Sequence, residues 1–287
     1  MWIQISKILI FTSLNPLLNI LAEENSQIPI HDVNWLVGIY SKSVLNPKLF
    51  YYKCQGIVIH YKVVLAPSSC LVSDLPNMEY VIRVYHWALD QKSTSPSNFK
   101  SYNVLKIYHY SMSNSYDYKQ KSNSLSFLLI EKTLPLVLYY PFDGQDITDT
   151  IDSKKCVIVH IKNKNEAIPI KQYNAFIQDN KCNGTLFKDI SASDSNYFVQ
   201  VKTDKFFCSD YEGGTLFCQS QHTPGKYLLT GLLINNDGCN SLHIKIKEYS
   251  KIILDYLYVV DNYWRTDKFD VVPSPQEFSV KFDDSDS

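Results

Sequence analysis

The sequence predicts an all-β fold with one helix near its end, and three observations predict it. Aromatic residues make up 14% of the 287 residues, β-branched residues are plentiful, and both classes favour strands. Short runs of such residues recur at close spacing, separated by Asn, Ser, Asp, Lys and Pro, which is typical of a sandwich or barrel. No period of about 20–50 residues repeats, which argues against a repeat protein.

The expected strands fall into two sets with a polar segment between them. The first set comprises Gln55–His60, Lys62–Ala66, Tyr80–Trp87, Tyr102–Tyr110 and Ser124–Ile130. The second set comprises Cys156–Ile161, Ala167–Ile177, Tyr197–Lys202, Gly214–Gln219, Tyr227–Asn235 and Leu242–Lys247. Residues 141–155 are polar and nearly free of adjacent apolar pairs, so we expect a linker between two β halves.

The last part of the chain divides into a helix and a polar tail. A helix is expected at Tyr249–Val260, because Ile252, Ile253 and Tyr256 recur at helical intervals. Residues 263–287 are rich in Asp, Ser, Lys and Pro and cannot bury much apolar surface. We therefore expect a flexible acidic tail there.

The first 22 residues predict a secretory signal peptide. Lys7 supplies an early positive charge, the apolar runs are too short to span a bilayer, and Ala22 is a cleavage point before an N-terminal segment at 23–33. The alternative is a frayed N-terminal helix. No later stretch approaches the roughly 18 consecutive apolar residues of a membrane span.

The charge balance and the glycine content exclude some partners and folds. The net charge of −1 gives no electrostatic reason to expect nucleic acid or an anionic membrane as a partner. Glycine accounts for only 9 residues, which counts against a fold whose many glycine-built loops remain intact.

Seven cysteines suit an oxidising compartment, and the odd number leaves one thiol unpaired or available to another chain. No CxxC pair or His/Cys cluster has zinc-ligand spacing, so neither a metal nor another cofactor is expected. The triplet Asn183-Gly184-Thr185 is a glycosylation sequon, which becomes relevant in a secreted glycoprotein.

Three segments of the first half occur in a distinctive order. The residues NWLV (34–37) come first. The residues CQGIVI (54–59) follow, and after them come VVLA and Cys70, which lies sixteen residues after Cys54. The residues NSLSFLL (123–129) come last. They resemble, respectively, the Pro-Trp opening of the first barrel, "CGGSLI…WVLTAAHC" and "NDIALL" of the chymotrypsin/trypsin-like serine proteases.

The second half continues this resemblance. The residues CSDYEGGTLFC (208–218) resemble "CQGDSGGPLVC", and GLLINNDGC (231–239) resembles "GIVSWG-GC". Cys156 stands where the family begins its second barrel. The resemblance covers most of residues 33–262. It implies a trypsin-like fold of two six-stranded antiparallel β-barrels with a C-terminal α-helix.

The resemblance also implies domain limits and disulfides. A trypsin-like domain would occupy 34–262, with the first barrel at 34–140 and the second barrel and helix at 156–262. The implied disulfides are Cys54–Cys70, Cys156–Cys218 and Cys208–Cys239. Cys182 is left over. It is either a buried, unreactive cysteine whose former disulfide partner this chain lacks, or half of an intermolecular disulfide.

The catalytic positions that the resemblance defines carry the wrong residues. Acyl transfer in this family needs a nucleophilic Ser, a His that takes its proton and an Asp that orients the His. The His position is Ser69, directly before Cys70, the Asp position is Ser124, and the Ser position is Glu212. A serine hydroxyl is too weakly basic to act as the general base. We therefore expect no catalytic residue.

The supporting parts of the site are also altered. The resemblance places Asp210 where the oxyanion-hole glycine belongs. It places Tyr211 where the family has the Asp that forms an ion pair with the new N-terminus after activating cleavage. No Arg or Lys lies between residues 23 and 34 to allow that cleavage. Bulky or polar residues stand at the expected pocket and substrate-pairing positions, namely Phe206, Phe207, Ile234, Asn235 and Asn236.

The sequence therefore predicts a secreted, extracellular serine protease homologue that is catalytically inactive, a pseudoprotease. We expect it to bind another secreted protein, such as an active protease or its substrate, as a cofactor, decoy, regulator, ligand or adhesion module. One alternative is a diverged hydrolase with residual serine-type endopeptidase activity or with a site built from Glu212 and Asp210. Another is a matrix component linked through Cys182. The partner could bind at the old cleft or at loops 111–123 and 189–196.

Overall fold

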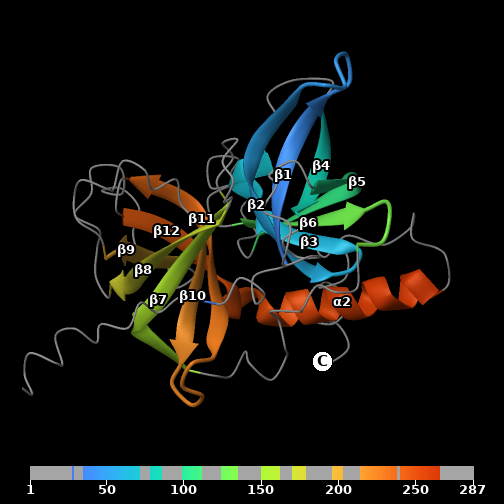
Figure 1. Ribbon diagram of the computed structural model, residues 1–287. Helices are drawn as coiled ribbons and strands as arrows, with labels where there is room; N and C mark the ends of the chain where they lie inside the picture. Colours follow the sequence, from blue (N-terminus) through green and yellow to red (C-terminus); the bar gives the residue numbers. More distant parts are fainter. Residues whose placement is uncertain are drawn as a thin grey trace, which may run out of the picture.

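The computed structural model describes residues 28, 35–71, 78–85, 99–111, 124–134, 150–161, 170–178, 196–202, 214–237 and 240–265. These residues form two closed barrels, each of six antiparallel strands, followed by a helix (Figure 1). The predicted fold class, all-β with two six-stranded barrels and a C-terminal helix, is confirmed.

The first barrel is closed by pairing of its first and fourth strands in the order β1-β2-β3-β6-β5-β4. Its strands are β1 (Leu36–Ser43), β2 (Phe50–His60), β3 (Val63–Pro67), β4 (Met78–Tyr85), β5 (Phe99–Ser111) and β6 (Ser124–Ile130). The strand β1 is not among the expected strands. Because six consecutive residues of β1 are buried, it lacks the alternation that marks a half-buried strand.

The second barrel has the order β10-β11-β12-β9-β8-β7. Its strands are β7 (Ile151–Ile161), β8 (Ile170–Gln178), β9 (Asn196–Val201), β10 (Thr215–Ser220), β11 (Tyr227–Asp237) and β12 (Asn240–Lys245). The start of β7 corrects the expected linker at 141–155. Although polar, its last five residues are strand, because Ile151 and Asp152 pair with the end of β10.

The helix α2 (Ser250–Arg265) follows a 3-10 turn, η8 (Ile246–Tyr249), and continues past the expected helix end at Val260. No glycine or proline occurs between Val260 and Arg265 to end it. The helix leaves the second barrel and runs beneath the first one (Figure 1). There the ring of Tyr256 packs against Phe127 of β6, with centroids 4.8 Å apart.

Besides smaller clusters within the second barrel, the described part of the chain has one hydrophobic core that both barrels share. It includes buried residues from strands of both barrels and from α2. At the boundary, Trp35 before β1 packs against Phe217 of β10, with ring centroids 5.0 Å apart. No helix in the described part of the chain is both long and apolar enough to span a bilayer.

Candidate functional site

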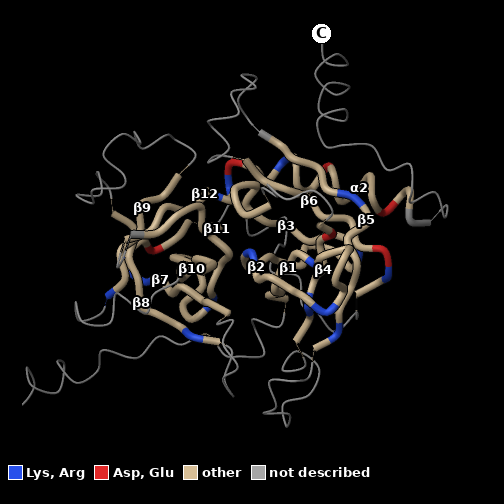
Figure 2. Tube along the Cα trace, turned by 90° about the horizontal axis from the view of Figure 1, so that it is seen from above, with Lys and Arg blue, Asp and Glu red and all other residues tan. Residues whose placement is uncertain are grey.

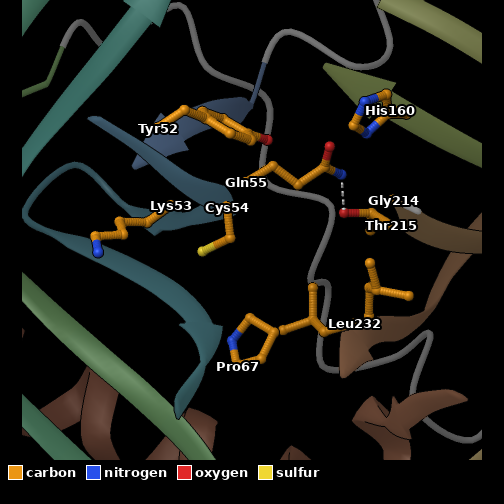
Figure 3. A pocket seen from close by; sticks show the side chains of 10 residues that line it. Tyr52, Lys53, Cys54, Gln55, Pro67, His160, Gly214, Thr215 and Leu232 are labelled. Atoms are coloured by element: carbon orange, nitrogen blue, oxygen red, sulfur yellow. Dashed lines mark hydrogen bonds between the residues drawn. The ribbon is translucent and has the colours of Figure 1, made fainter. Parts of the chain in front are cut away.

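A pocket of about 110 Å³ lies where the two barrels meet (Figure 3). One wall comes from β2 and the end of β3, and the other from β7, β10 and β11 with the residue that precedes β10. The lining residues are Tyr52, Lys53, Cys54, Gln55, Pro67, His160, Gly214, Thr215, Leu232 and Leu233. Two of them lie close in sequence to positions that the resemblance assigns to a catalytic triad. Pro67 lies two residues before Ser69, and Gly214 lies two residues after Glu212.

The side chain of Gln55 crosses this boundary between the barrels. Its Nε2 donates hydrogen bonds to the carbonyl oxygen of Val159 (2.9 Å) and to the hydroxyl of Thr215. Its Oε1 accepts a hydrogen bond from the amide of Ile161 (3.0 Å). Gln55 therefore pairs with β7 as a short additional strand would, and it joins the pocket's two walls (Figure 3).

Sequence reasoning missed this contact, although a signal for it was present. In the family motif "CGGSLI" that the segment at 54–59 resembles, the position of Gln55 is a glycine. A glycine has no side chain that could reach the second barrel. A long amide at that position is the one change in this segment that could join the two barrels.

Two of the three positions that the resemblance assigns to a catalytic triad lie on neighbouring elements. Ser69 is half-buried in the 3-10 turn η2 (Ser68–Leu71), and Ser124 is buried at the start of β6. The hydroxyls of Ser68 and Ser126 lie 2.7 Å apart, so η2 packs directly on β6. Neither catalytic position carries an imidazole or a carboxylate.

The third catalytic position, Glu212, lies outside the described residues, as do Asp210, Phe206 and Phe207. The nearest described residue is Gly214, which is buried against β7. A Cβ atom at this position would come within 2.5 Å of the carbonyl oxygen of Val159. Only a glycine therefore allows the chain to pass this close to β7.

The expected substrate-pairing residues are part of β11. The partly buried side chain of Ile234 packs against Phe198 and Leu242, which form a small satellite core. Asn235 is exposed, and its side-chain oxygen accepts a hydrogen bond from the amide of Asn236 (2.9 Å). Ile234 therefore helps to pack the second barrel.

Two of the three implied disulfides are present. Cys54–Cys70 joins β2 to η2 and so holds the segment that contains Ser69. Cys156–Cys218 joins neighbouring strands of the second barrel, where the two residues are register partners. The Cys208–Cys239 pair, Cys182 and the sequon at Asn183 lie outside the described residues.

Two serine–histidine contacts occur away from the pocket. The Nδ1 of His109 lies 2.7 Å from the hydroxyl of Ser126, and the Nε2 of His243 lies 2.8 Å from the hydroxyl of Ser241. Both serines are completely buried, so a substrate carbonyl cannot reach their hydroxyls. These contacts satisfy buried polar groups. The described residues also contain no group of three or more His, Cys, Asp or Glu side chains that could hold a metal ion.

Two buried histidines predict a dependence of stability on pH. Complete burial lowers the pKa of His243 to about 3. Burial also lowers the pKa of His60, although its hydrogen bond to Asp261 (3.0 Å) acts in the opposite direction. Both imidazoles are therefore neutral in the folded chain at pH values where the unfolded chain, with a histidine pKa of about 6.5, binds protons.

We expect the free energy of unfolding to fall as the pH falls below about 6.5, by about 2 kcal/mol at pH 5 from His243 alone. Urea unfolding at pH 7.5, 6 and 5 measures it. His243→Leu should make this slope clearly smaller, whereas His222→Gln, at an exposed position, should retain it. An unchanged slope in His243→Leu would contradict the assignment.

No protein-family model matches the chain, and no curated protein matches it. Among solved structures, 652 chains match. One of them, described as "Structure of GrC" and belonging to a granzyme, has a TM-score of 0.57 and 13% sequence identity, over 81% of this chain and 97% of that chain. A likeness at this identity concerns the fold alone, and the two closed barrels of this chain fit a trypsin-like fold.

Proposed function

We propose that the chain is a secreted serine protease homologue that lacks proteolytic activity and acts by binding another protein. The observation that carries this proposal is the chemistry of the two described catalytic positions. Cys54–Cys70 holds η2 against β2, and the Ser68–Ser126 contact holds η2 against β6, as a protease would require. The positions on them, Ser69 and Ser124, supply no group that could take a proton from a nucleophile.

The pocket supports the same proposal. A protease must admit a substrate strand between its barrels, whereas here Gln55 hydrogen-bonds across the boundary to β7 and to Thr215. In the sequence, Glu212 and Asp210 would add carboxylates where negative charge develops during acyl transfer. Phe206 and Phe207 would fill the specificity pocket.

Separate observations support secretion. The apolar residues 1–22 suit a signal peptide, and two disulfides suit an oxidising compartment. Glycosylation at Asn183 would be compatible with that route. The partner would be another secreted protein, an active protease or its substrate. The chain would act on it as a cofactor, decoy, regulator, ligand or adhesion module.

The test is a direct assay of activity on the purified chain. We expect no labelling by a serine-directed fluorophosphonate probe and no turnover of a peptide substrate library, with trypsin as the positive control. Labelling or turnover above a heat-inactivated sample would overturn the proposal in favour of a diverged hydrolase.

A triple revertant makes a sharper prediction. Ser69→His, Ser124→Asp and Glu212→Ser together should still give no trypsin-like turnover, because Gln55 remains between the barrels and Asp210 remains at the oxyanion position. Adding Gln55→Gly and Asp210→Gly to the revertant, each separately, tests which of these two residues prevents turnover. Efficient cleavage by the triple revertant alone would show that only the triad is damaged.

A further inference from the structure

The hairpin formed by β1 and β2 carries a cluster of exposed apolar side chains. Of the seven large apolar side chains exposed in the described part of the chain, four belong to this hairpin: Val44, Leu45, Leu49 and Tyr51. Leu45, the most exposed, has 84% of its surface accessible. The hairpin stands out from the end of the first barrel (Figure 1). Exposed apolar groups gathered in this way mark interaction sites.

Hydrogen bonds within the turn hold these side chains in place. The amide of Leu49 donates to the carbonyl oxygen of Asn46 (2.9 Å), and the amide of Ser43 donates to the carbonyl oxygen of Leu49 (3.3 Å). The hydroxyl of Ser43 accepts a hydrogen bond from the amide of Asn46 (3.2 Å). Because the turn is already ordered, the hairpin itself loses little conformational entropy when a partner binds to it.

The charge around the hairpin is positive. Lys42, Lys48 and Lys53 lie on it, and Arg83 lies on β4, which pairs with β1. The only carboxylate among the described residues of these three strands is Glu79, which lies 3.9 Å from Lys42. Figure 2 shows this excess as blue segments along the first barrel. It is a local property, because the whole chain carries a net charge of −1.

Arg83 is held at the base of the hairpin by aromatic rings. Its guanidinium carbon lies 4.2 Å from the ring centre of Tyr40, 4.3 Å from that of Phe50 and 4.2 Å from that of Phe99. No carboxylate of the described residues forms an ion pair with it. A guanidinium fixed in this way is ready to pair with an incoming carboxylate.

We propose that the hairpin surface, defined as Val44, Leu45, Leu49 and Arg83, docks a segment of a partner protein in which Asp or Glu alternates with large apolar side chains. An apolar segment alone would bury Arg83 without a carboxylate. A polyanion alone would leave the three apolar side chains uncovered. The inference rests on the proposed protein-binding function and names the chemistry of the partner.

The test selects binding peptides from a phage-displayed library of random 12-residue peptides on the immobilised full chain. We expect the enriched peptides to combine carboxylates with large apolar residues. One enriched peptide, labelled for fluorescence anisotropy, should bind about tenfold more weakly to Leu45→Ser/Leu49→Ser and to Arg83→Gln. Its affinity should also fall between about 50 and 300 mM salt.

Matched variants elsewhere serve as controls. Tyr258→Ser removes an apolar side chain of similar exposure (68%) from α2, and Lys154→Gln removes an exposed cation from β7. Neither should change the affinity. Leu45 and Leu49 are exposed, so their replacement should preserve the fold, and circular dichroism checks this. The test therefore remains decisive even if Arg83→Gln destabilises the barrel.

Several outcomes would overturn the proposal. They are a failure to enrich peptides, enriched peptides without carboxylates, and binding that survives both hairpin variants. If a peptide of residues 266–287 competes for binding, and this competition depends on the same side chains, the acidic tail would be the occupant. Heparin binding lost in Arg83→Gln and retained in Leu45→Ser/Leu49→Ser would make the surface a polyanion site. None of these outcomes involves peptide turnover, so they leave the proposed lack of activity standing.

Discussion

Gln55→Leu should lower the free energy of unfolding by about 3 kcal/mol or more. Leucine has a similar volume but no amide, so the carbonyl oxygen of Val159 and the amide of Ile161 both lose a buried hydrogen-bond partner. Each buried group left without a partner costs about 1–3 kcal/mol. Urea unfolding measures the loss, and hydrogen exchange should become faster at the Ile161 amide in particular.

The matched control is Gln178→Leu. The side-chain amide of Gln178 donates a hydrogen bond to the side-chain oxygen of Gln200 (2.6 Å), within the second barrel and only partly buried. We expect a change below about 1 kcal/mol, because water can replace that partner. Equal losses in the two variants would mean that Gln55 contributes nothing beyond an ordinary side-chain contact.

Removing the Cys156–Cys218 disulfide should be the other large effect. The bond closes a loop between residues 62 apart in sequence, and both half-cystines are buried. The chain-entropy relation gives about 4 kcal/mol for a loop of this length and about 3 kcal/mol for one near 15 residues. Cys156→Ala/Cys218→Ala should therefore be less stable than Cys54→Ala/Cys70→Ala, whose cysteines are 16 residues apart.

Unfolding of the two double variants under identical conditions tests this order. Non-reducing peptide mapping of the unmodified chain provides the control, because it should recover both disulfides and the predicted Cys208–Cys239 bond. A larger loss for Cys54→Ala/Cys70→Ala would mean that native-state contacts around η2 outweigh loop length.

Local patterns account for most of the strands that could be predicted. Ser124–Ile130 is an apolar run with polar residues before it, and its bounds as β6 agree with the prediction. Leu36–Ser43 was missed because burial of both faces removes the alternation. The start of β7 was missed because its polar residues owe their strand conformation to pairing with β10, which no local pattern encodes.

The part of the candidate site that depends on the spacing of cysteines could be predicted from the sequence. The part that depends on contacts between residues far apart in sequence could not. The interval between Cys54 and Cys70, taken with the resemblance, placed Ser69 at the expected His position, and the disulfide between these cysteines is present. The partners of Gln55 lie more than a hundred residues away in sequence. Likewise, Leu45 and Leu49 have the composition of core residues, and only the closed barrel shows that they face outward.

The position of α2 has a consequence for the order in which the chain can fold during synthesis. The described strands of the first barrel end at Ile130, yet Phe127 is covered by Tyr256, and His60 meets Asp261, far later in the sequence. The first barrel therefore leaves the ribosome with an apolar face that the chain can cover only after the second barrel has been translated. A nascent chain halted before residue 250 should present that face to chaperones, and release of the final helix should end their binding.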